Sequence, residues 1–304
     1  MLNNSDKILT IFTPTYNRAY ILPQLYESLK NQTSNKFKWL IVDDGSTDET
    51  QKLVSSWIND DQIDIQYIKQ ENSGKMKAHN VGVENTETEL FVCVDSDDWI
   101  VPKTVEEISA KWDGLSKEVQ NKIIGFVAYR GKNAREVIGN EFPAGLEEAS
   151  LNELYNKGFT GDTTLVFKTD IIKQYPFPII NGEKFIPEAF IYEQIDRMYK
   201  YRLIPFIMIV CEYRDDGLTK NTLKTALNNP CGYVTYFIQK ANFSDGIKEK
   251  VGCYIRANCF RHKIKNKELP VVAENKLLYN LLYPAGLALF FSKKIKYKRL
   301  QKGD

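Results

Sequence analysis

Acidic side chains gather directly after two short apolar runs of this sequence. Asp43-Asp44 follows the run Phe37 to Val42, and Asp95-Ser96-Asp97-Asp98 follows the run Leu90 to Val94. Three carboxylates within four residues repel one another unless a cation or hydrogen-bond donors offset their charge. Mg²⁺ and Mn²⁺ bind carboxylate and phosphate oxygens together, so an Asp-x-Asp turn can hold a metal that also binds a diphosphate. The pattern indicates either such a site or an acidic surface turn that caps the next helix.

The elements around these clusters alternate between strand and helix. The hydrophobic pattern predicts strands at Ile8–Thr13, 37–42, Ile63–Ile68 and 90–94, with helices at 20–31, about 48–57 and 77–84. Ser46 or Thr47 is expected to N-cap the second helix. This alternation is typical of an α/β fold with a parallel sheet and right-handed crossovers. Because ligands bind outside the carboxyl ends of strands in such sheets, both acidic clusters fall at the expected edge.

The rest of the chain is mixed at first and then helical. Strands are predicted at Ile123–Arg130, Thr164–Phe167 and Ile204–Cys211, with a helix at Glu188–Tyr201. Past about Leu218 the pattern is mostly helical. No GxGxxG follows the first strand and no GxxxxGK[ST] occurs, which counts against a dinucleotide-binding Rossmann domain and a P-loop NTPase.

Four motifs in order over the first hundred residues resemble those of the inverting, GT-A-fold glycosyltransferases of family 2, common in bacterial polysaccharide synthesis. They are Thr13-Pro14-Thr15-Tyr16-Asn17, Val42-Asp43-Asp44-Gly45-Ser46-Thr47-Asp48, Asn72-Ser73-Gly74 with Ala78-His79-Asn80-x-Gly82, and Val94-Asp95-Ser96-Asp97-Asp98. The resemblance covers about the first 215 residues. It implies a GT-A catalytic domain at 1–219, with a nucleotide-sugar half at about 1–100 and an acceptor half at about 101–219. A helical C-terminal region at 220–304 would follow.

The resemblance also implies which residues form the donor site. Asp97 would bind the metal, Mn²⁺ or Mg²⁺, and Asp95 the ribose, with Ser96 between them. Thr13, Pro14 and Tyr16 would lie against the base of the nucleotide sugar, and Asp43 or Asp44 would bind the base or ribose. Gly74 and Lys75 would lie near the nucleotide pocket, where Lys75 can neutralise the diphosphate. Read alone, Tyr16 could be a turn aromatic and Lys75 a solvated charge. His79 stands where the family usually has arginine, so we assign it no catalytic role.

An inverting transfer needs a carboxylate that takes the proton of the acceptor hydroxyl. In the family this residue belongs to a Glu-Asp pair that opens a helix and leads through a strand to Tyr-Arg, which here is Tyr213-Arg214. Glu188 falls where the pair begins, but Ala189 replaces its aspartate. We predict Glu188 as the base, with Glu193 and Asp196 as fallbacks. Glu188 could instead complement a helix N-terminus.

Charge is distributed unevenly along the chain. The net charge is +2, yet residues 220–304 hold 17 Lys or Arg against 5 Asp or Glu, a balance of +12, which leaves −10 for residues 1–219. An acidic body argues against nucleic acid as a partner. An apolar stretch at 275–291 precedes six basic residues in ten positions, which is typical of a helix at an anionic lipid surface, although a buried packing helix is the alternative.

The remaining signals concern compartment and metal chemistry. The five cysteines show no paired spacing, which suits a reducing compartment, and the N-terminus carries no apolar signal segment. Together with the C-terminal helix this predicts the cytoplasmic face of the cell membrane. Cys253, Cys259 and His262 match no closed four-ligand zinc pattern, so core or surface cysteines are expected.

The sequence therefore predicts a metal-dependent, inverting glycosyltransferase of the hexosyl or N-acetylhexosaminyl class. It would move a sugar from a nucleoside diphosphate, with UDP expected, to a hydroxyl of a growing, lipid-linked cell-surface glycan. The alternative is a non-catalytic subunit of a glycan synthase complex that binds nucleotide sugar or acts as a scaffold, which Ala189 favours. A nucleotidyltransferase would share the metal site but give no reason for the Tyr-Arg segment.

Overall fold

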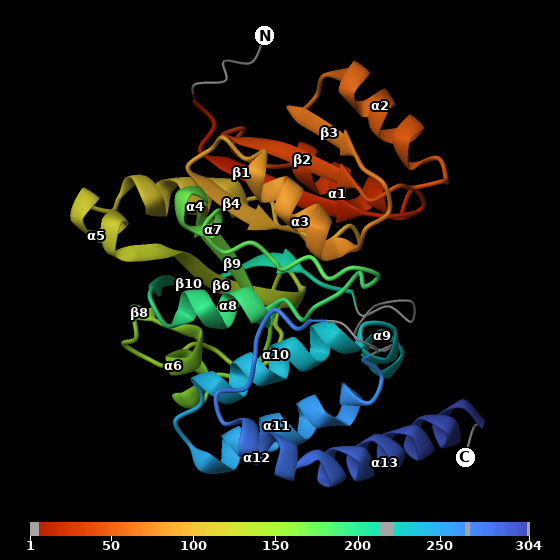
Figure 1. Cartoon of the computed structure of the whole chain (residues 1–304). Coiled ribbons are helices and arrows are strands. Elements are labelled where there is room, and N and C mark those ends of the chain that lie inside the picture. The colour runs from red at the N-terminus through yellow and green to blue at the C-terminus, as the bar shows by residue number, and fades with distance from the viewer. Residues whose placement is uncertain (1–5, 213–221, 265–267, 303–304) are drawn as a thin grey trace. The chain divides into compact units, whose positions relative to one another are not determined.

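The computed structural model describes residues 6–212, 222–264 and 268–302, with side chains described up to Ile295 (Figure 1). Contacts divide the chain into two compact units. The first unit comprises residues 1–176 and 194–212, and the second comprises 177–193 and 213–304. The expected catalytic domain and C-terminal region stay a prediction, since this division groups residues 177–193 with the C-terminal helices.

A twisted sheet forms the centre of the first unit. Its strands follow the order β3-β2-β1-β4-β9-β6-β10-β5. The bounds are β1 (Leu9–Thr15), β2 (Phe37–Asp43), β3 (Ile65–Lys69), β4 (Leu90–Cys93), β5 (Trp99–Ile100), β6 (Ile123–Asn133), β9 (Thr163–Lys168) and β10 (Lys200–Val210). Strands β1 to β4 pair in parallel, as does β6 with β10, whereas β9 and β5 run antiparallel to their partners. Two short strands, β7 (Glu136–Val137) and β8 (Glu148–Ala149), pair with β6 and β10.

The helices of the first unit bury apolar side chains against this sheet. Trp39 of β2 is fully buried and stacks near Tyr26 and Trp57, whose rings lie 4.3 Å apart. Such aromatic stacking adds to the free energy that burial itself contributes. The helices are α1 (Leu22–Lys30), α2 (Thr50–Asp60), α3 (Lys75–Glu84), α4 (Thr104–Asp113), α5 (Lys117–Lys122), α6 (Leu151–Asn156) and α7 (Thr169–Ile172).

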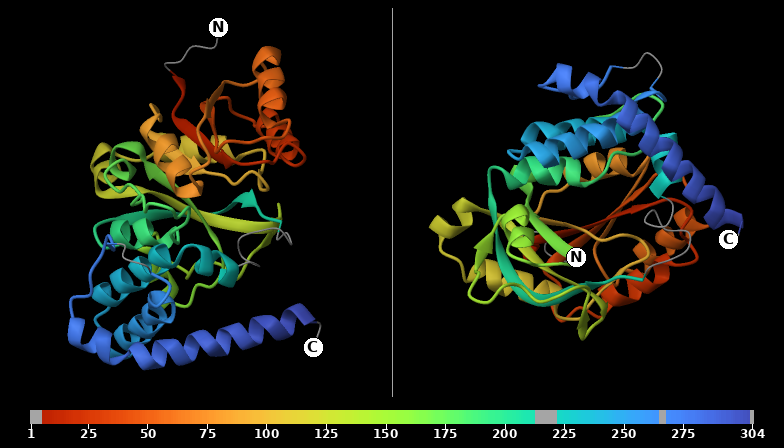
Figure 2. Two further views of the ribbon diagram at one scale, coloured as in Figure 1. Left: turned by 45° about the vertical axis from the view of Figure 1, so that its right-hand side comes forward. Right: turned by 90° about the horizontal axis from the view of Figure 1, so that it is seen from below.

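Helices make up most of the second unit. Within it α10 (Pro230–Phe243) lies beside α11 (Ile247–Arg261), and α13 (Tyr283–Lys302) lies beside α11, running on as one continuous helix in Figure 2. The shorter helices are α9 (Thr222–Asn228) and α12 (Lys276–Leu281), and α8 (Ala189–Asp196) begins in this unit and ends in the first. Cys253 and Cys259 are fully buried in its core, as expected for core cysteines. Among the described residues, no helix combines the length and the apolar character needed to cross a bilayer.

The predicted mixed α/β architecture with a mostly parallel central sheet is confirmed, and two local predictions were wrong. The helix predicted for 188–201 ends at Asp196, because the chain enters β10 at Lys200. Neither Ser46 nor Thr47 caps α2, which begins at Thr50. Glu49 is the N-cap residue and makes no side-chain cap bond. The side chain before it, Asp48, accepts at Oδ1 from the Thr50 backbone N–H at 3.1 Å and from the Thr50 hydroxyl at 2.6 Å.

Candidate active site

Asp43 and Asp44 lie at the carboxyl end of β2, and both carboxylates are buried. Asp43 accepts hydrogen bonds from the Ser46 backbone N–H at 2.7 Å and from the Tyr67 hydroxyl. Asp44 accepts from the backbone N–H groups of Ser73 at 2.7 Å and Gly74 at 2.8 Å. Asp44 therefore fixes the loop that leads into α3. The predicted contact of either carboxylate with a base or ribose stays a prediction.

The end of β1 lies beside the loop that follows β2. Thr13 is fully buried, and its hydroxyl accepts a hydrogen bond from the Trp39 indole N–H at 2.9 Å. Pro14 is also buried, whereas Tyr16 is 47% exposed. Asn17 joins this motif to the next, because its Oδ1 accepts from the Thr47 N–H at 2.8 Å. An exposed ring on an anchored turn can stack on a base, and contacts of Thr13, Pro14 and Tyr16 with the nucleotide stay predictions.

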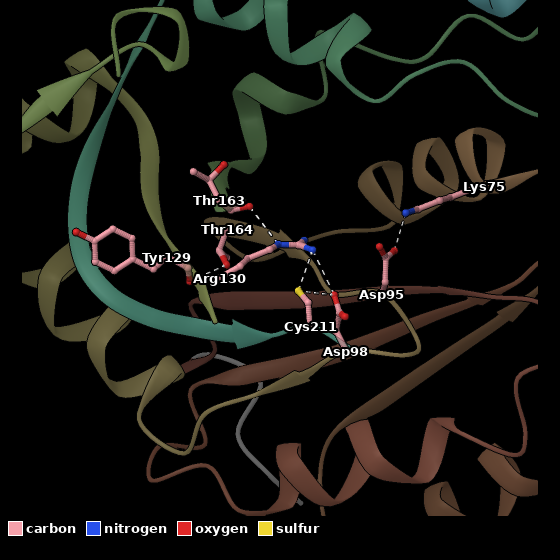
Figure 3. A network of polar contacts seen from close by, with 8 residues as sticks. All are labelled: Lys75, Asp95, Asp98, Tyr129, Arg130, Thr163, Thr164 and Cys211. Carbon is pink, nitrogen blue, oxygen red and sulfur yellow. Dashed lines mark hydrogen bonds and ion pairs between the residues drawn. The ribbon is translucent and has the colours of Figure 1, made fainter. Parts of the chain in front are cut away.

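Lys75 begins α3 and forms an ion pair with Asp95, with 2.6 Å between Nζ and Oδ1 (Figure 3). Gly74 precedes it with φ of 97°, a conformation that side chains other than glycine rarely adopt. Partial burial opposes ionisation of Asp95, but Lys75 and then Arg130 outweigh it and hold the pKa of that carboxyl below its usual value. Lys75 is thus directed at the acidic turn and is not merely a solvated charge.

Asp98 belongs to a second, more deeply buried cluster. The Arg130 guanidinium NH1 lies 3.3 Å from Asp98 Oδ2 and 3.4 Å from Cys211 Sγ, and Arg130 Nε donates to the Thr163 carbonyl at 3.1 Å (Figure 3). Burial raises the pKa of Asp98 to about 7, with Arg130 opposing the shift and the charges of Asp95 and Asp97 adding to it. Burial also raises the pKa of Cys211 to about 12, so its thiol is protonated at neutral pH and donates to Asp98.

Asp97 differs from its two acidic neighbours in its partners. It makes no ion pair with any residue that the structure describes, whereas Asp95 pairs with Lys75 and Asp98 with Arg130. Partial burial and the negative charge of Asp95 raise its pKa, so a cation placed there would favour the ionised form.

A cation at Asp97 would need further ligands beside this one carboxylate. In the described part of the chain no three His, Cys, Asp or Glu side chains are grouped to hold a metal. Mg²⁺ is commonly held by one or two carboxylates, water and substrate phosphates, so Asp97 fits a metal bound together with a diphosphate.

Glu188 lies in the second unit, one residue before α8, and is partly buried. The two fallback residues are engaged elsewhere. Glu193 pairs with Lys240 at 2.6 Å and accepts from the Tyr236 hydroxyl at 3.1 Å. Asp196 accepts from the backbone N–H groups of Leu151 and Asn152, the latter at 2.8 Å, and so caps α6. Tyr213-Arg214 lies outside the described residues.

His79 packs inside the sheet–helix layer. It is 5% exposed, and its ring makes edge contacts with Phe12 and Phe91 at centroid distances of 5.7 and 5.5 Å. Burial, aided by the charge of Lys75, lowers its pKa to about 3, so the imidazole is neutral at physiological pH. That His79 has no catalytic role stays a prediction.

Two arginines near the acidic turn were not predicted from sequence. Arg130 stands at the end of a predicted strand, and nothing local indicates which way its side chain points. Arg18 lies close enough for its charge to lower the pKa of Asp97, against the larger effect of burial, and it donates to the Tyr20 hydroxyl at 2.5 Å. Its place directly after the Tyr16-Asn17 motif is a signal that could have found it.

The order of the sheet strands and the acidic strand ends define a nucleotide-sugar transferase fold of the GT-A type. A model of the family described as "Glycosyl transferase family 2" matches residues 10–175, more than half of the sequence. The chain belongs to this family.

Several curated relatives resemble part of this chain. The poly(ribitol-phosphate) beta-N-acetylglucosaminyltransferase TarS of Staphylococcus aureus is 28% identical over 167 residues, 54% of this chain and 28% of TarS. A teichoic acid poly(glycerol phosphate) polymerase of Staphylococcus epidermidis is 40% identical over 91 residues, 30% of this chain and 13% of the polymerase. This chain thus spans less than a third of either. A GalNAc(5)-diNAcBac-PP-undecaprenol beta-1,3-glucosyltransferase of Campylobacter jejuni is 25% identical over 232 residues, 74% of this chain and 72% of that protein.

Solved structures share the fold at low identity. TarS 1-349 in complex with UDP-GlcNAc superposes with a TM-score of 0.58 at 17% identity, covering 96% of this chain and 92% of that one. A mannosyltransferase of Pyrobaculum calidifontis in complex with GDP-Man and Mn²⁺ gives 0.53 at 16% identity, covering 92% and 73%. At these identities the likeness establishes the fold alone.

Proposed function

We propose that this chain is a metal-dependent, inverting glycosyltransferase that moves a hexosyl or N-acetylhexosaminyl group from a UDP-sugar to a hydroxyl. The observation that carries the proposal is the division of charge in the acidic turn. Lys75 forms an ion pair with Asp95 and Arg130 forms one with Asp98, while Asp97 makes no ion pair among the described residues. A partly buried carboxylate in that situation favours a cation beside it. The UDP-GlcNAc complex of TarS supports the choice of donor.

Lys75 and Asp97 would act on the leaving group. When bound at Asp97, Mn²⁺ or Mg²⁺ supplies positive charge to the diphosphate. Lys75, at the first turn of α3, adds a positive charge at the N-terminal end of that helix, where the backbone dipole also favours an anion. Both charges stabilise the negative charge that develops on the diphosphate as its bond to the sugar breaks.

Glu188 would serve as the base. The acceptor oxygen forms a bond to the anomeric carbon, the bond from that carbon to the diphosphate breaks, and the hydroxyl proton passes to the Glu188 carboxylate. Glu188 is preferred over Glu193 and Asp196 because it stands where the Glu-Asp pair of the family begins.

We further propose a lipid-linked glycan as acceptor, reached at the cytoplasmic face of the membrane. The printed substrate of the Campylobacter jejuni relative, an undecaprenol-linked glycan, supports this class. On the second unit, Leu277 and Leu281 of α12 and Phe291 and Ile295 of α13 are each more than half exposed. Apolar side chains beside lysines bind anionic lipid surfaces.

A non-catalytic subunit that binds nucleotide sugar is the second candidate, and Ala189 favours it because the aspartate expected there is missing. Turnover separates the two. With Mn²⁺ present, the enzyme should release UDP from a UDP-sugar when a glycan acceptor is added. A non-catalytic subunit should bind the UDP-sugar but should not release UDP from it.

Replacing Asp97 tests the metal assignment. Asp97→Asn keeps the shape of the side chain but loses its charge, so metal-dependent UDP binding and transfer should both fall below detection while the fold survives. Asp113→Asn is the matched control, because that carboxylate is exposed and pairs with Lys36 at 3.3 Å. Near-normal turnover in Asp97→Asn would show that the metal site lies elsewhere.

A further inference from the structure

The acidic turn carries the chain across the sheet. Residues 94–98 connect β4 to β5, and β5 pairs with β10 at the edge of the sheet, so the turn passes the ends of β9, β6 and β10, which lie between β4 and β5. At the start of the turn, the Val94 N–H donates to the Phe12 carbonyl at 2.9 Å. After the turn, Trp99 of β5 pairs with Val210 of β10. Side-chain contacts therefore help to fix the acidic turn over the strands that it crosses.

Arg130 lies on one of the crossed strands, and its side chain reaches the turn. It stands in β6, and its guanidinium contacts Asp98 of the turn, the Thr163 carbonyl of β9 and Cys211 directly after β10 (Figure 3). One planar group thus joins three strands to the turn. A guanidinium can donate to several acceptors in fixed directions, which the single ammonium of a lysine cannot reproduce.

Arg130 anchors the turn through a buried contact. Asp98 is buried, and its Oδ2 lies 3.3 Å from the Arg130 guanidinium. Without Arg130 this contact between the turn and β6 is lost, so the turn is held less firmly over the sheet. Asp97 would then shift, because it is the residue directly before Asp98 in the sequence.

We propose that Arg130 is a positioning residue of the donor site: through Asp98 it fastens the acidic turn across the sheet and so keeps Asp97 in place for the cation and the diphosphate. This inference rests on the proposed function. It assigns Arg130 no contact with the donor.

The test measures how much Mn²⁺ is needed for UDP to bind, using calorimetry with purified full-length protein and UDP as the probe. Arg130→Gln removes the charge, and Arg130→Lys keeps it but loses the several directed contacts. We expect both variants to need at least about tenfold more Mn²⁺ than the wild type for half-maximal UDP binding, as is typical when the support of a metal ligand is lost. Arg202→Gln is the matched control, because Arg202 lies in β10 of the same sheet and pairs with Glu147 at 2.9 Å and Glu148 at 3.0 Å.

Each outcome decides the matter. An increased Mn²⁺ requirement in the Arg130 variants, with Arg202→Gln like the wild type, supports the proposal. An unchanged requirement in a folded Arg130 variant, an equal increase in Arg202→Gln, or failure of both Arg130 variants to fold would overturn it and leave Arg130 a structural role. If wild-type protein binds UDP without any dependence on a divalent cation, the metal-dependent function itself fails. The two failures are therefore distinguishable.

Discussion

At the scale of single residues, Glu188 tests the chemistry separately from binding. Glu188→Gln removes a base but no predicted ligand of the donor, so UDP affinity should stay unchanged while the transfer rate falls about 10²- to 10⁴-fold. Calorimetry with UDP and Mn²⁺ and a single-turnover transfer assay measure the two quantities. Glu193→Gln is the control, because it breaks the pair with Lys240 and should affect stability more than rate. Full activity in Glu188→Gln would place the base on another acidic residue.

His79 gives a prediction about pH. The pKa of His79 is about 3 in the folded chain, because burial disfavours the imidazolium. In the unfolded chain the side chain is exposed, so its pKa returns to the ordinary value of 6.5. Below about pH 6.5 the unfolded chain therefore binds one more proton at this site, so the free energy of unfolding falls as the pH decreases. Because of His79, the free energy of unfolding should be roughly 2 kcal/mol lower at about pH 5 than at about pH 7.5.

Urea unfolding of the wild type and of His79→Phe at both pH values measures this difference. Phenylalanine keeps an aromatic ring between Phe12 and Phe91 but cannot take up a proton. Carboxylates elsewhere contribute equally to both proteins, so the pH dependence should be smaller in His79→Phe by the amount that His79 contributes. Identical pH dependence in the two proteins would show that His79 is not held neutral by the fold.

The sequence made part of this site predictable. The acidic clusters could be found because several carboxylates follow apolar strands, and Lys75 because a motif precedes it. Arg130 could not, because it is 32 residues from Asp98 along the chain and the two meet only through the order of the strands. The same holds for Tyr67, which donates to Asp43 from the neighbouring strand.

At the scale of elements, Gly82 sets how closely α3 packs on β1. A Cβ at this position would lie 2.4 Å from two ring carbons of Phe12, much closer than van der Waals contact. Gly82→Ala should therefore lower the free energy of unfolding by about 1–3 kcal/mol, the usual cost of overpacking a core.

Gly252 provides the matched control for that substitution. It also lies within a helix, α11, but a Cβ there meets no atom within 4 Å. Gly252→Ala should raise the free energy of unfolding by up to about 1 kcal/mol, since alanine favours helix over glycine. Denaturant unfolding measures both variants. Equal changes would mean that helix propensity, and not the Phe12 contact, decides the effect at Gly82.

The N-terminal strands were predictable because each is a short apolar run bounded by polar residues. The insertion of β9 between β4 and β6, antiparallel to both, was not, since it depends on pairing between Leu90 and Lys168 and between Gly125 and Phe167. Local periodicity carries no information on which distant strand becomes a neighbour.

At the scale of the whole molecule, the chain combines an acidic N-terminal part with a basic C-terminal part. In the second unit residues 275–291 have both buried and exposed apolar side chains, and their contact with lipid stays a prediction. Tyr279 and Phe290 are buried against α11 in the core of that unit, whereas Leu277, Leu281, Phe291 and Ile295 are exposed. Deleting this segment would remove part of the core, so a truncated protein cannot test membrane binding.

Surface substitutions can test it instead. Replacing all four exposed residues by glutamine leaves the buried side and every lysine in place, so the fold should survive. Wild-type protein should sediment with anionic vesicles and not with zwitterionic ones, because basic residues near an anionic surface contribute about 1 kcal/mol each and apolar burial adds to this. Binding should weaken at about 1 M salt, where the Debye length is about 3 Å. The fourfold variant should stay largely in the supernatant.

A control variant distinguishes lipid binding by this surface from nonspecific binding by any exposed apolar side chain. Ile58→Gln with Met198→Gln removes two other exposed apolar side chains, 41% and 70% exposed, that lie in the first unit. It should sediment with anionic vesicles as the wild type does. If the control variant loses binding as well, or if the fourfold variant keeps it, α12 and α13 do not hold the chain to lipid. The exposed apolar side chains would then face a protein partner or a second copy of the chain, which the sedimentation of lipid-free protein in the ultracentrifuge would detect.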